Sequence, residues 1–342
     1  MVFMQSFPRV LGALLASGLL LLAAGCGTSG SGAAAPQPGQ LSIVAAFYPF
    51  QYVAERVAGP HAAVTNLTQP GAEPHDLELS PRQVADLARA DLVIYEKTFQ
   101  PAVDEAVEQS GAGEVLETGT VVPLQPIATE HGGDDHDHEH DQGGTEEGGT
   151  EEGGADEGAA GPADEHDHGG LDPHVWLDPV HMITITEAVA KRLEQADPGH
   201  ATDYRTNAAT LTDQLKGLDR SYKSGLAQCQ RTEFVTSHAA FGYLAERYGL
   251  TQISINGLSP DTEPSPARIA AVQQQISQHH VTTIFYETLV SPAVAKSVAG
   301  DLKLRTDVLD PLEGITKQSR GTDYLSVMKS NLTALEKANG CS

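Results

Sequence analysis

The residues from Thr129 to Gly170 constrain the fold most, because they cannot be buried in a core. Up to His168 this stretch holds fifteen Asp or Glu residues, six His and no Lys or Arg, and Gly makes up much of the remainder. A segment with so few apolar residues and so much like charge cannot bury enough surface to offset the entropy of ordering. We therefore predict a disordered insertion over 129–170 and a chain that folds on both sides of it.

The acidity of the chain is concentrated in this insertion. Among 342 residues with a formal net charge of -25, 46 are acidic; fifteen of these lie in the insertion, and the other 31 face 21 basic residues. This balance argues against nucleic acid as a partner, because binding to phosphates needs clustered Lys and Arg. The length is sufficient for two ordinary domains.

The N-terminus has the pattern of an export signal. Arg9 precedes an apolar run that ends in small residues, and this run is shorter than the ~20 residues of a membrane-spanning helix. Cys26 follows Ala-Ala-Gly, which resembles a bacterial lipobox. We predict a lipoprotein signal peptide over 1–25, lipidation of Cys26 and a flexible Gly-, Ser- and Pro-rich tether over 26–40. The alternative is an ordinary secretory signal followed by an incidental cysteine.

Apolar runs of strand length alternate with helical patterns on both sides of the insertion. The expected strands cover 41–47, 62–68, 91–96, 233–238, 250–255, 281–287 and 304–310. The expected helices cover 48–59, 80–90, 101–111, 239–249, 265–280, 291–302 and 322–340. Such alternation is typical of parallel sheets with helical crossovers, which predicts an α/β fold.

Helical spacing without strands joins the two halves of the chain. It covers 179–226, with a break near 196–200, and its second piece is long enough to connect two lobes. The predicted organisation is therefore an N-terminal α/β lobe over 41–178, a helical connector over 179–227 and a C-terminal α/β lobe over 228–342, each lobe with a mainly parallel sheet.

Four residues outside the insertion have the character of metal ligands. His75, His238 and Asp310 lie at or just past the carboxyl ends of expected strands, where open α/β sheets bind ligands. His174 lies in a Pro-rich turn where the chain re-enters the fold. Three imidazoles and one carboxylate form a plausible tetrahedral set for Zn²⁺, whereas magnesium and calcium sites are rich in oxygen. The spacing is no local metal motif and gives only a weak signal by itself.

Several phrases resemble the zinc-binding subunits of bacterial ABC importers, the ZnuA-like cluster of solute-binding lipoproteins. The matching phrases are GAEPHDLELSP, LDPHVWLDP, FVTSHAAFGYLAERYGL, IFYETLVSP and LDPLEG, and the similarity spans essentially all of 41–340. An acidic, His-rich loop before the second histidine is also a mark of the zinc members. The resemblance implies two α/β lobes bridged by one long rigid helix, with the metal in the cleft between the lobes and His75, His174 and His238 as ligands.

The resemblance leaves the fourth metal ligand open. Asp310 matches the usual carboxylate position of the family, while some relatives use a Glu a few residues later, which here is Glu313. Other relatives use water or a Glu just before the first histidine, and that Glu is displaced here to Glu73. His238 at the third position favours zinc over manganese. Glu287 is a candidate to hold an imidazole by a hydrogen bond, or else a charge at a helix N-terminus.

Cys229 and Cys341 are the cysteines that remain after processing at Cys26. An even number of cysteines in an exported protein favours a disulfide, which here would attach the C-terminal helix to the body of the protein. Two separate thiols are the alternative, because the sequence shows no distance.

The histidines of the insertion are candidates for transient zinc binding through neutral imidazoles. They are His131, His136, His138, His140, His166 and His168. Because the insertion is expected to be disordered, it cannot hold one fixed coordination geometry. Our hypothesis is that it captures zinc and raises its concentration near the folded site; an unselected solvated linker is the alternative.

These features together favour a binding protein and not an enzyme. The resemblance implies a monomeric extracytoplasmic subunit of an ABC importer, anchored to the cell membrane by a lipid on Cys26, that delivers Zn²⁺ as cargo to a permease and its cytoplasmic ATPase. The alternatives are a zinc-dependent hydrolase with a three-His site, a manganese carrier, and a surface adhesin or metal buffer without a transporter. A carboxylate in the fourth coordination position would distinguish transport from hydrolysis.

Overall fold

The computed structural model describes residues 37–127 and 170–342, together with Met1. The predicted signal peptide 1–25, Cys26 and most of the tether lie outside these residues. The predicted insertion, except Gly170, and its six histidines lie outside them too. What the sequence indicates for these segments therefore stays a prediction.

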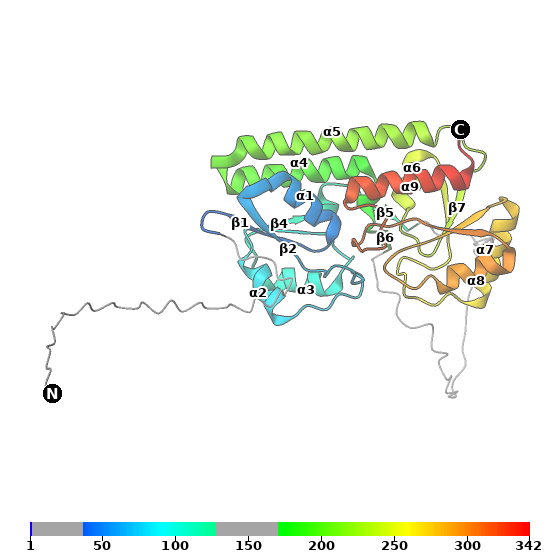
Figure 1. Cartoon of the computed structure of the whole chain (residues 1–342), viewed down its shortest axis with the longest axis horizontal. Coiled ribbons are helices and arrows are strands. Elements are labelled where there is room, and N and C mark those ends of the chain that lie inside the picture. The colour runs from blue at the N-terminus through cyan, green and yellow to red at the C-terminus, as the bar shows by residue number, and fades with distance from the viewer. Residues whose placement is uncertain (2–36, 128–169) are drawn as a thin grey trace, which may run out of the picture. The chain divides into compact units, whose positions relative to one another are not determined.

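The N-terminal half, coloured blue to cyan in Figure 1, folds around a four-stranded parallel sheet in the order β2-β1-β3-β4. The strands are β1 (Leu41–Ala45), β2 (Ala62–Asn66), β3 (Leu92–Tyr95) and β4 (Glu114–Glu117). The helices that accompany them are α1 (Tyr48–Ala58), α2 (Pro81–Arg89) and α3 (Pro101–Ser110), with a 3-10 turn η1 (Gly59–His61) after α1 and η2 (Thr118–Thr120) after β4.

Local sequence signals set the ends of these elements. All of β3 is buried, as expected for a strand covered on both faces of a parallel sheet. Helix α2 begins after Ser80, whose side chain accepts a hydrogen bond from the backbone of Gln83 while the Gln83 side chain accepts one from the backbone of Ser80. Strand β4 was not predicted, because this edge strand has the sequence EVLE and buries only Leu116.

Two helices follow the N-terminal lobe. They are α4 (Pro179–Ala196) and α5 (Ala201–Gly225), and a 3-10 turn, η4 (Pro198–His200), separates them where a break was predicted. Near its start, α5 is joined to the N-terminal lobe, because Asn207 Nδ2 donates to the carbonyl of Val57 at 3.0 Å. Near its end, the hydroxyl of Tyr222 donates to the carbonyl of Met328 in the C-terminal lobe at 2.7 Å. Helix α5 is therefore the long helix that bridges the lobes.

The C-terminal half folds around a second four-stranded parallel sheet, in the order β10-β9-β7-β8. Its strands are β7 (Glu233–Thr236), β8 (Thr251–Ser254), β9 (Thr283–Tyr286) and β10 (Arg305–Val308). Its helices are α6 (Gly242–Tyr248), α7 (Pro266–Gln278), α8 (Ala293–Leu302) and α9 (Tyr324–Asn339). The predicted fold class, two α/β lobes with parallel sheets and a long helix, is confirmed.

A disulfide links Cys229, which follows α5, to Cys341, which follows α9. It is the pairing that the even number of cysteines indicates. The bond attaches the C-terminal end of the chain to the start of the second lobe, across 112 residues of sequence.

The two sheets share one topology. In each sheet the first strand in sequence pairs with the second and the third, and the fourth lies beside the third. The sequence FQYVAER in α1 also recurs as FGYLAER at the start of α6. The strand registers make residues equivalent: Val44 pairs with Thr65 and Val93 in the first sheet, and Val235 pairs with Ile253 and Ile284 in the second. The lobes are therefore two copies of one structural unit.

A short antiparallel pair fixes the chain where it re-enters the fold. Strands β5 (Gln125–Pro126) and β6 (Leu171–Asp172) lie on the two sides of the segment that the structure does not describe. The hydroxyl of Tyr243 in α6 accepts from the backbone of Gln125 at 2.8 Å and donates to the carbonyl of Asp172 at 2.6 Å. The second lobe thus holds both strands of the pair in place, and β6 leads directly to His174.

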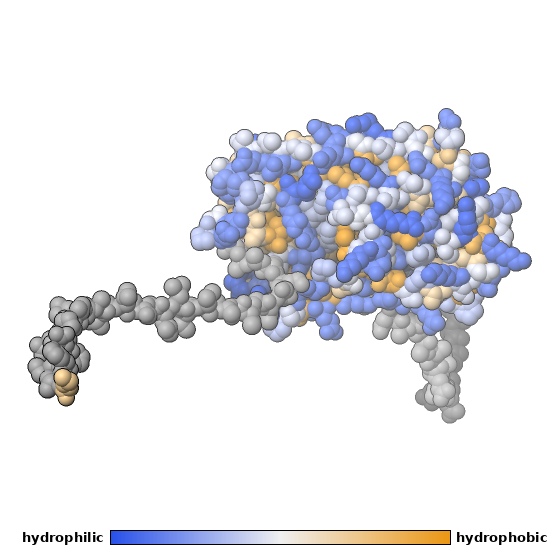
Figure 2. Space-filling view, in the orientation of Figure 1, coloured by the Kyte–Doolittle hydropathy of each residue, from blue (hydrophilic) through white to orange (hydrophobic). Residues whose placement is uncertain are grey.

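The described surface is mainly polar. Figure 2 shows hydrophilic side chains over most of the visible face, with apolar residues in small separate patches. Among the described residues, Met1 and Val84 are the large hydrophobic residues that are exposed. In the same part of the chain, no helix has the length and apolar character needed to span a membrane.

Candidate metal site

Three imidazoles and one carboxylate meet in a buried site. One ligand atom from each of His75, His174, His238 and Glu313 lies within 4.8 Å of all the others. Oε1 of Glu313 lies 3.5 Å from Nε2 of His75, 3.5 Å from Nε2 of His174 and 3.2 Å from Nε2 of His238. Tetrahedral coordination at ~2.0 Å separates ligand atoms by roughly 3.3 Å, so the Glu313 oxygen already lies at suitable distances from all three imidazole nitrogens for sharing one zinc ion.

Four separate segments supply these side chains. His75 lies in the loop between β2 and α2, and His174 directly precedes the 3-10 turn η3 (Val175–Leu177). His238 is the second residue after β7, and Glu313 follows β10. Because β2 belongs to the first sheet and β7 and β10 to the second, the site forms only where the two lobes meet.

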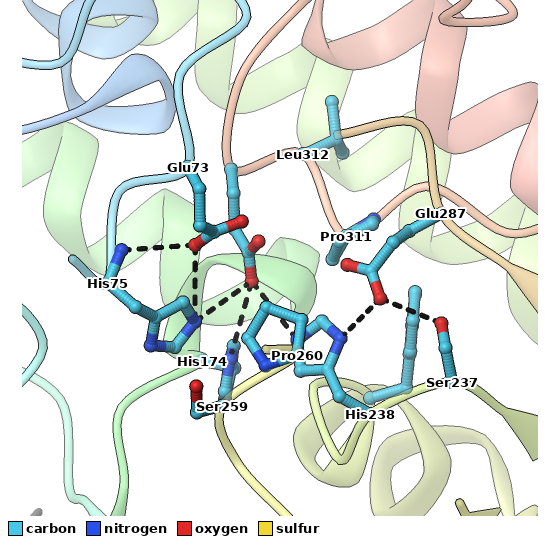
Figure 3. A network of polar contacts seen from close by, with 12 residues as sticks. Glu73, His75, His174, Ser237, His238, Ser259, Pro260, Glu287, Pro311 and Leu312 are labelled. Carbon is cyan, nitrogen blue, oxygen red and sulfur yellow. Dashed lines mark hydrogen bonds and ion pairs between the residues drawn. The ribbon is translucent and has the colours of Figure 1, made fainter. Parts of the chain in front are cut away.

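Two further carboxylates orient the imidazoles. Oδ1 of Asp172 accepts hydrogen bonds from the backbone N–H of His174 at 2.9 Å and from its Nδ1 at 2.7 Å. Oε1 of Glu287 accepts from Nδ1 of His238 at 2.8 Å and from the hydroxyl of Ser237 at 2.7 Å (Figure 3). With the ring protons on Nδ1, both rings present Nε2 to the centre of the site, which is the arrangement that metal-binding histidines usually show.

Glu287 was a predicted partner of an imidazole, and it contacts His238 as expected. Asp172 was not predicted. The signal was present in the sequence, because this acid stands two residues before His174 and a proline lies between them. That turn lets one carboxylate oxygen reach both the backbone and the ring of the same histidine.

Aromatic side chains pack around the imidazoles and exclude water. The ring centroid of Phe99 lies 4.5 Å from that of His75, and the ring centroid of Trp176 lies 5.1 Å from that of His174. Trp176 Nε1 donates to the carbonyl of Pro311 at 2.7 Å, two residues before Glu313. The same indole therefore packs on one candidate ligand and holds the loop that carries another.

The electrostatics of the site favour a divalent cation. Burial lowers the pKa of His75 to about 4. Burial also disfavours charge on His174 and His238, but Asp172 outweighs it and raises the pKa of His174, and Glu287 with Glu313 raises that of His238 well above its usual value. Burial disfavours the Glu313 carboxylate as well, yet His238 and the hydrogen bonds of the imidazoles hold its pKa well below the usual range. A metal ion would replace the protons that His174 and His238 retain.

Glu73, an alternative fourth ligand, lies beside the group without joining it (Figure 3). Its Oε1 accepts from the backbone of His75 at 3.0 Å and lies 4.0 Å from Nε2 of the same residue. Burial, together with the charge of Glu313, raises the pKa of Glu73 to about 9. Glu313 Oε1 lies within 3.5 Å of Nε2 of all three imidazoles, so Glu313 is the better candidate.

Asp310, the predicted fourth ligand, does not belong to the group of four, in which Glu313, the predicted alternative, supplies the carboxylate. Oδ1 of Asp310 accepts from the backbone of Leu312 at 2.9 Å, and its Oδ2 accepts from the hydroxyl of Thr288 at 3.1 Å. Leu312 has a φ of 61°, which L-residues rarely adopt. Asp310 therefore holds a tight turn, and this turn carries Glu313 into the site.

The fold and the site define a class: a two-lobed protein with a buried group of three imidazoles and one carboxylate between its lobes. Comparison with known proteins places the chain more narrowly. The family described as zinc-uptake complex component A, periplasmic, matches residues 43–338. The chain belongs to this family.

Individual relatives agree with this assignment. The chain is 32% identical over 334 residues to the high-affinity zinc uptake system protein ZnuA of Bacillus subtilis, covering 96% of this chain and 98% of that protein. It is 35% identical over 305 residues to the zinc-binding lipoprotein AdcA of Streptococcus pneumoniae, covering 87% of this chain but only 56% of AdcA. The chain thus spans about half the length of the AdcA proteins that it matches.

A solved structure shows the same fold. The zinc-bound ZnuA-like domain of AdcA from Streptococcus pneumoniae superposes with a TM-score of 0.67 at 32% sequence identity. The match covers 88% of this chain and 99% of that domain. The two α/β lobes are therefore those of a solute-binding protein of this family.

Proposed function

We propose that this chain is the extracytoplasmic zinc-binding subunit of an ABC importer. It binds Zn²⁺ as cargo through His75, His174, His238 and Glu313 and delivers it to a membrane permease that is driven by a cytoplasmic ATPase. The observation that carries the proposal is the meeting of these four side chains, each at most 2% exposed, from four segments and both lobes.

The donor set supports zinc over manganese as the cargo. Three imidazole nitrogens and one carboxylate oxygen are typical of zinc, whereas manganese sites are richer in oxygen. The names of the relatives point the same way, since ZnuA and AdcA are described as zinc uptake and zinc-binding proteins.

The fourth position supports transport over catalysis. A zinc hydrolase keeps that position open for water. Here the carboxylate of Glu313 lies within 3.5 Å of all three imidazoles and is fully buried, so it closes the coordination. Closed coordination by protein ligands suits a protein that holds an ion and later releases it.

We further propose that Cys26 carries the lipid that anchors the chain to the outer face of the cell membrane, with 26–40 as a tether. The proposed organisation is a lobe over 41–178, a connector over 179–227 and a lobe over 228–342. The word lipoprotein in the name of AdcA supports the anchor. Mass spectrometry of the mature protein tests it, because a diacylglyceryl-modified N-terminal cysteine has a characteristic mass.

The histidines of the insertion are proposed to capture zinc for the folded site. The support is positional, since the described chain resumes at Gly170 and reaches His174 four residues later. Deletion of 130–168 is expected to reduce uptake when zinc is limiting and to leave the affinity of the folded site unchanged. Equal uptake by the deletion variant at limiting zinc would remove this role.

Zinc titration tests the proposal as a whole. The protein is expected to bind one zinc ion tightly at the folded site, measured with the insertion deleted, and to bind manganese far more weakly. His174→Ala is expected to abolish tight binding while the lobes stay folded. His279→Ala is the matched control, because that exposed histidine lies 3.2 Å from Glu233, outside the group of four. Unchanged affinity in His174→Ala would refute the assignment, and the absence of neighbouring permease and ATPase genes would favour a metal buffer or an adhesin.

A further inference from the structure

The repeat of one structural unit in the two lobes makes their strand ends comparable. Strand register makes Thr68 and Asn256 equivalent. Thr68 stands three residues after Thr65, which pairs with Val44, and Asn256 stands three residues after Ile253, which pairs with Val235. The segments after the third strands align as YEKTFQPAV and YETLVSPAV, which makes Gln100 equivalent to Ser291. Thr68 and Gln100 therefore occupy the same place in the first lobe as Asn256 and Ser291 in the second, but the side chain of Gln100 is much longer than that of Ser291.

In the first lobe, Gln100 fills this place. It is 1% exposed, and its Nε2 donates to the hydroxyl of Thr68 at 3.0 Å and to the carbonyl of Pro74 at 3.1 Å. Nε2 of Gln100 thus satisfies two acceptors, the Thr68 hydroxyl just past β2 and the Pro74 carbonyl in the following loop. A buried acceptor of this kind needs such a donor, because an unpaired one costs the desolvation of the group.

In the second lobe, the equivalent place is a cavity of about 300 Å³. Ser291 is short and exposed, so it does not fill the space. Asn256 lines the cavity, is 9% exposed and donates from Nδ2 to the carbonyl of Pro260 at 2.9 Å. Its Oδ1 is buried and accepts no hydrogen bond from the residues that the structure describes. In the first lobe, Gln100 donates to the equivalent acceptor, the hydroxyl of Thr68, whereas no described residue donates to Oδ1 of Asn256.

The charges around the cavity select the kind of group that fits. Asp261 and Glu263 line it, and none of its lining residues is Lys or Arg. Burial raises the pKa of Asp261, and the nearby carboxylate of Asp76 in the other lobe raises it further. The walls also include Ile255, Val290 and Val294. An apolar stem with a cationic, hydrogen-donating end matches these features, as in arginine.

The cavity adjoins the candidate metal site through one hydroxyl. Ser237 lines the cavity and donates to Oε1 of Glu287, the same oxygen that accepts from Nδ1 of His238 (Figure 3). Oε2 of Glu287 is buried and has no hydrogen-bond partner among the described residues. A positive charge placed beside Ser237 would attract this carboxylate and weaken its hydrogen bond with Nδ1 of His238.

We propose that this cavity receives a basic side chain of the permease, an arginine whose guanidinium donates to Oδ1 of Asn256 and to the hydroxyl of Ser237 between Asp261 and Glu263. Its charge, placed at Ser237, attracts the Glu287 carboxylate away from Nδ1 of His238 and so weakens zinc binding when the loaded protein docks. This inference rests on the proposed function. It assigns to the second lobe a docking pocket that is coupled to release of the ion.

A small-molecule probe tests the coupling in the zinc-loaded protein. Nα-acetyl-arginine amide is expected to increase the rate of zinc release to a chromogenic chelator by up to roughly tenfold, within the range that partners of a metal-bound histidine control. Nα-acetyl-citrulline amide, which has almost the same shape without the charge, is expected to have no effect. Equal effects of the two compounds, or no effect of either, would overturn the coupling.

Ser291 provides the matched variants. Ser291→Gln places in the second lobe the side chain that fills the equivalent space in the first, whereas Ser291→Ala leaves the cavity open. Both variants are expected to keep the zinc affinity of the wild type, because Ser291 does not contact the site. Only Ser291→Gln is expected to lose the response to the arginine probe and to reduce zinc uptake by cells that depend on this protein.

The outcomes separate the two proposals. If the wild type itself neither binds nor imports zinc, the proposed function fails. If the wild type and Ser291→Gln import zinc equally well, the function stands and the docking pocket is overturned. A response to the probe together with normal uptake by Ser291→Gln would assign the cavity to a small cationic ligand and would overturn the permease as its occupant.

Discussion

Replacing Asp172 with asparagine is expected to weaken zinc binding by roughly tenfold. In the structure, one carboxylate oxygen of this residue accepts hydrogen bonds from the backbone and from Nδ1 of His174, at 2.9 and 2.7 Å. Asparagine keeps an oxygen acceptor of nearly the same size, so the ring keeps its orientation. It loses the negative charge that makes the imidazole a stronger donor to a metal. The substitution therefore separates charge from position.

The magnitude follows from what each substitution leaves behind. Hydrogen-bonded partners of metal-bound histidines contribute roughly 10- to 100-fold in affinity, and Asp172→Asn should fall at the lower end because the acceptor remains. A tenfold loss corresponds to about 1.4 kcal/mol. Asp172→Ala removes the acceptor as well and is expected near the upper end, about 2.8 kcal/mol. At a fixed, saturating concentration of free zinc, the stabilisation of the fold by zinc falls by the same amounts.

Competition with a chromogenic zinc chelator at neutral pH measures these affinities, and thermal unfolding with and without zinc checks them independently. Asp219→Asn is the matched control, because this buried aspartate lies in α5 and accepts from Lys223 and Tyr248 instead of a histidine. It is expected to alter stability and leave zinc affinity unchanged. Wild-type affinity in Asp172→Asn and Asp172→Ala alike would show that this carboxylate does not support His174, and the reasoning would be refuted.

Three other perturbations have defined outcomes. Glu313→Gln is expected to weaken zinc binding by at least roughly 100-fold and Asp310→Asn by less than roughly tenfold, by calorimetry; the reverse order would make Asp310 the ligand. In metal-free protein, the pKa of Glu73 is about 9 in the folded state against a reference value of 4.5 for the unfolded chain. The folded state therefore binds more protons between these pH values, and stability falls as pH rises through them. Glu73→Gln removes this loss, and urea unfolding should show a gain over wild type that grows from about pH 5 to pH 9; a constant difference would contradict it. Replacing both Cys229 and Cys341 with serine is expected to cost about 2–5 kcal/mol in unfolding free energy without changing zinc affinity.

Much of the fold was predictable because local signals carry it. Alternating apolar runs and helical patterns gave the main strands of both sheets, and Ser80 with Pro81 marked the start of α2. Strand β4 was not predicted, because it is stabilised by pairing with β3 and not by its own apolar content. The pair β5–β6 was not predicted either, because strands of two residues have no periodic pattern.

The candidate site was predictable in its residue types but not in its final member. The three histidines were recognisable from the phrases around them, and both Asp310 and Glu313 were candidates. The choice between the two carboxylates depends on a turn in which Leu312 takes a positive φ and Asp310 accepts a hydrogen bond from its backbone. A backbone conformation of this kind leaves no pattern in a single sequence.

The amino-acid sequence by itself determined that this chain has two α/β halves, an acidic segment inside the first that cannot form a core, and three histidines with the character of metal ligands. It did so because periodicity, capping and composition act over a few residues at a time. Only the tertiary structure decided that Glu313 joins the imidazoles, that Asp172 supports His174, and that the second lobe keeps open a space that Gln100 fills in the first. These outcomes depend on contacts between segments that are far apart in the chain, and such contacts exist only once the two lobes have packed together.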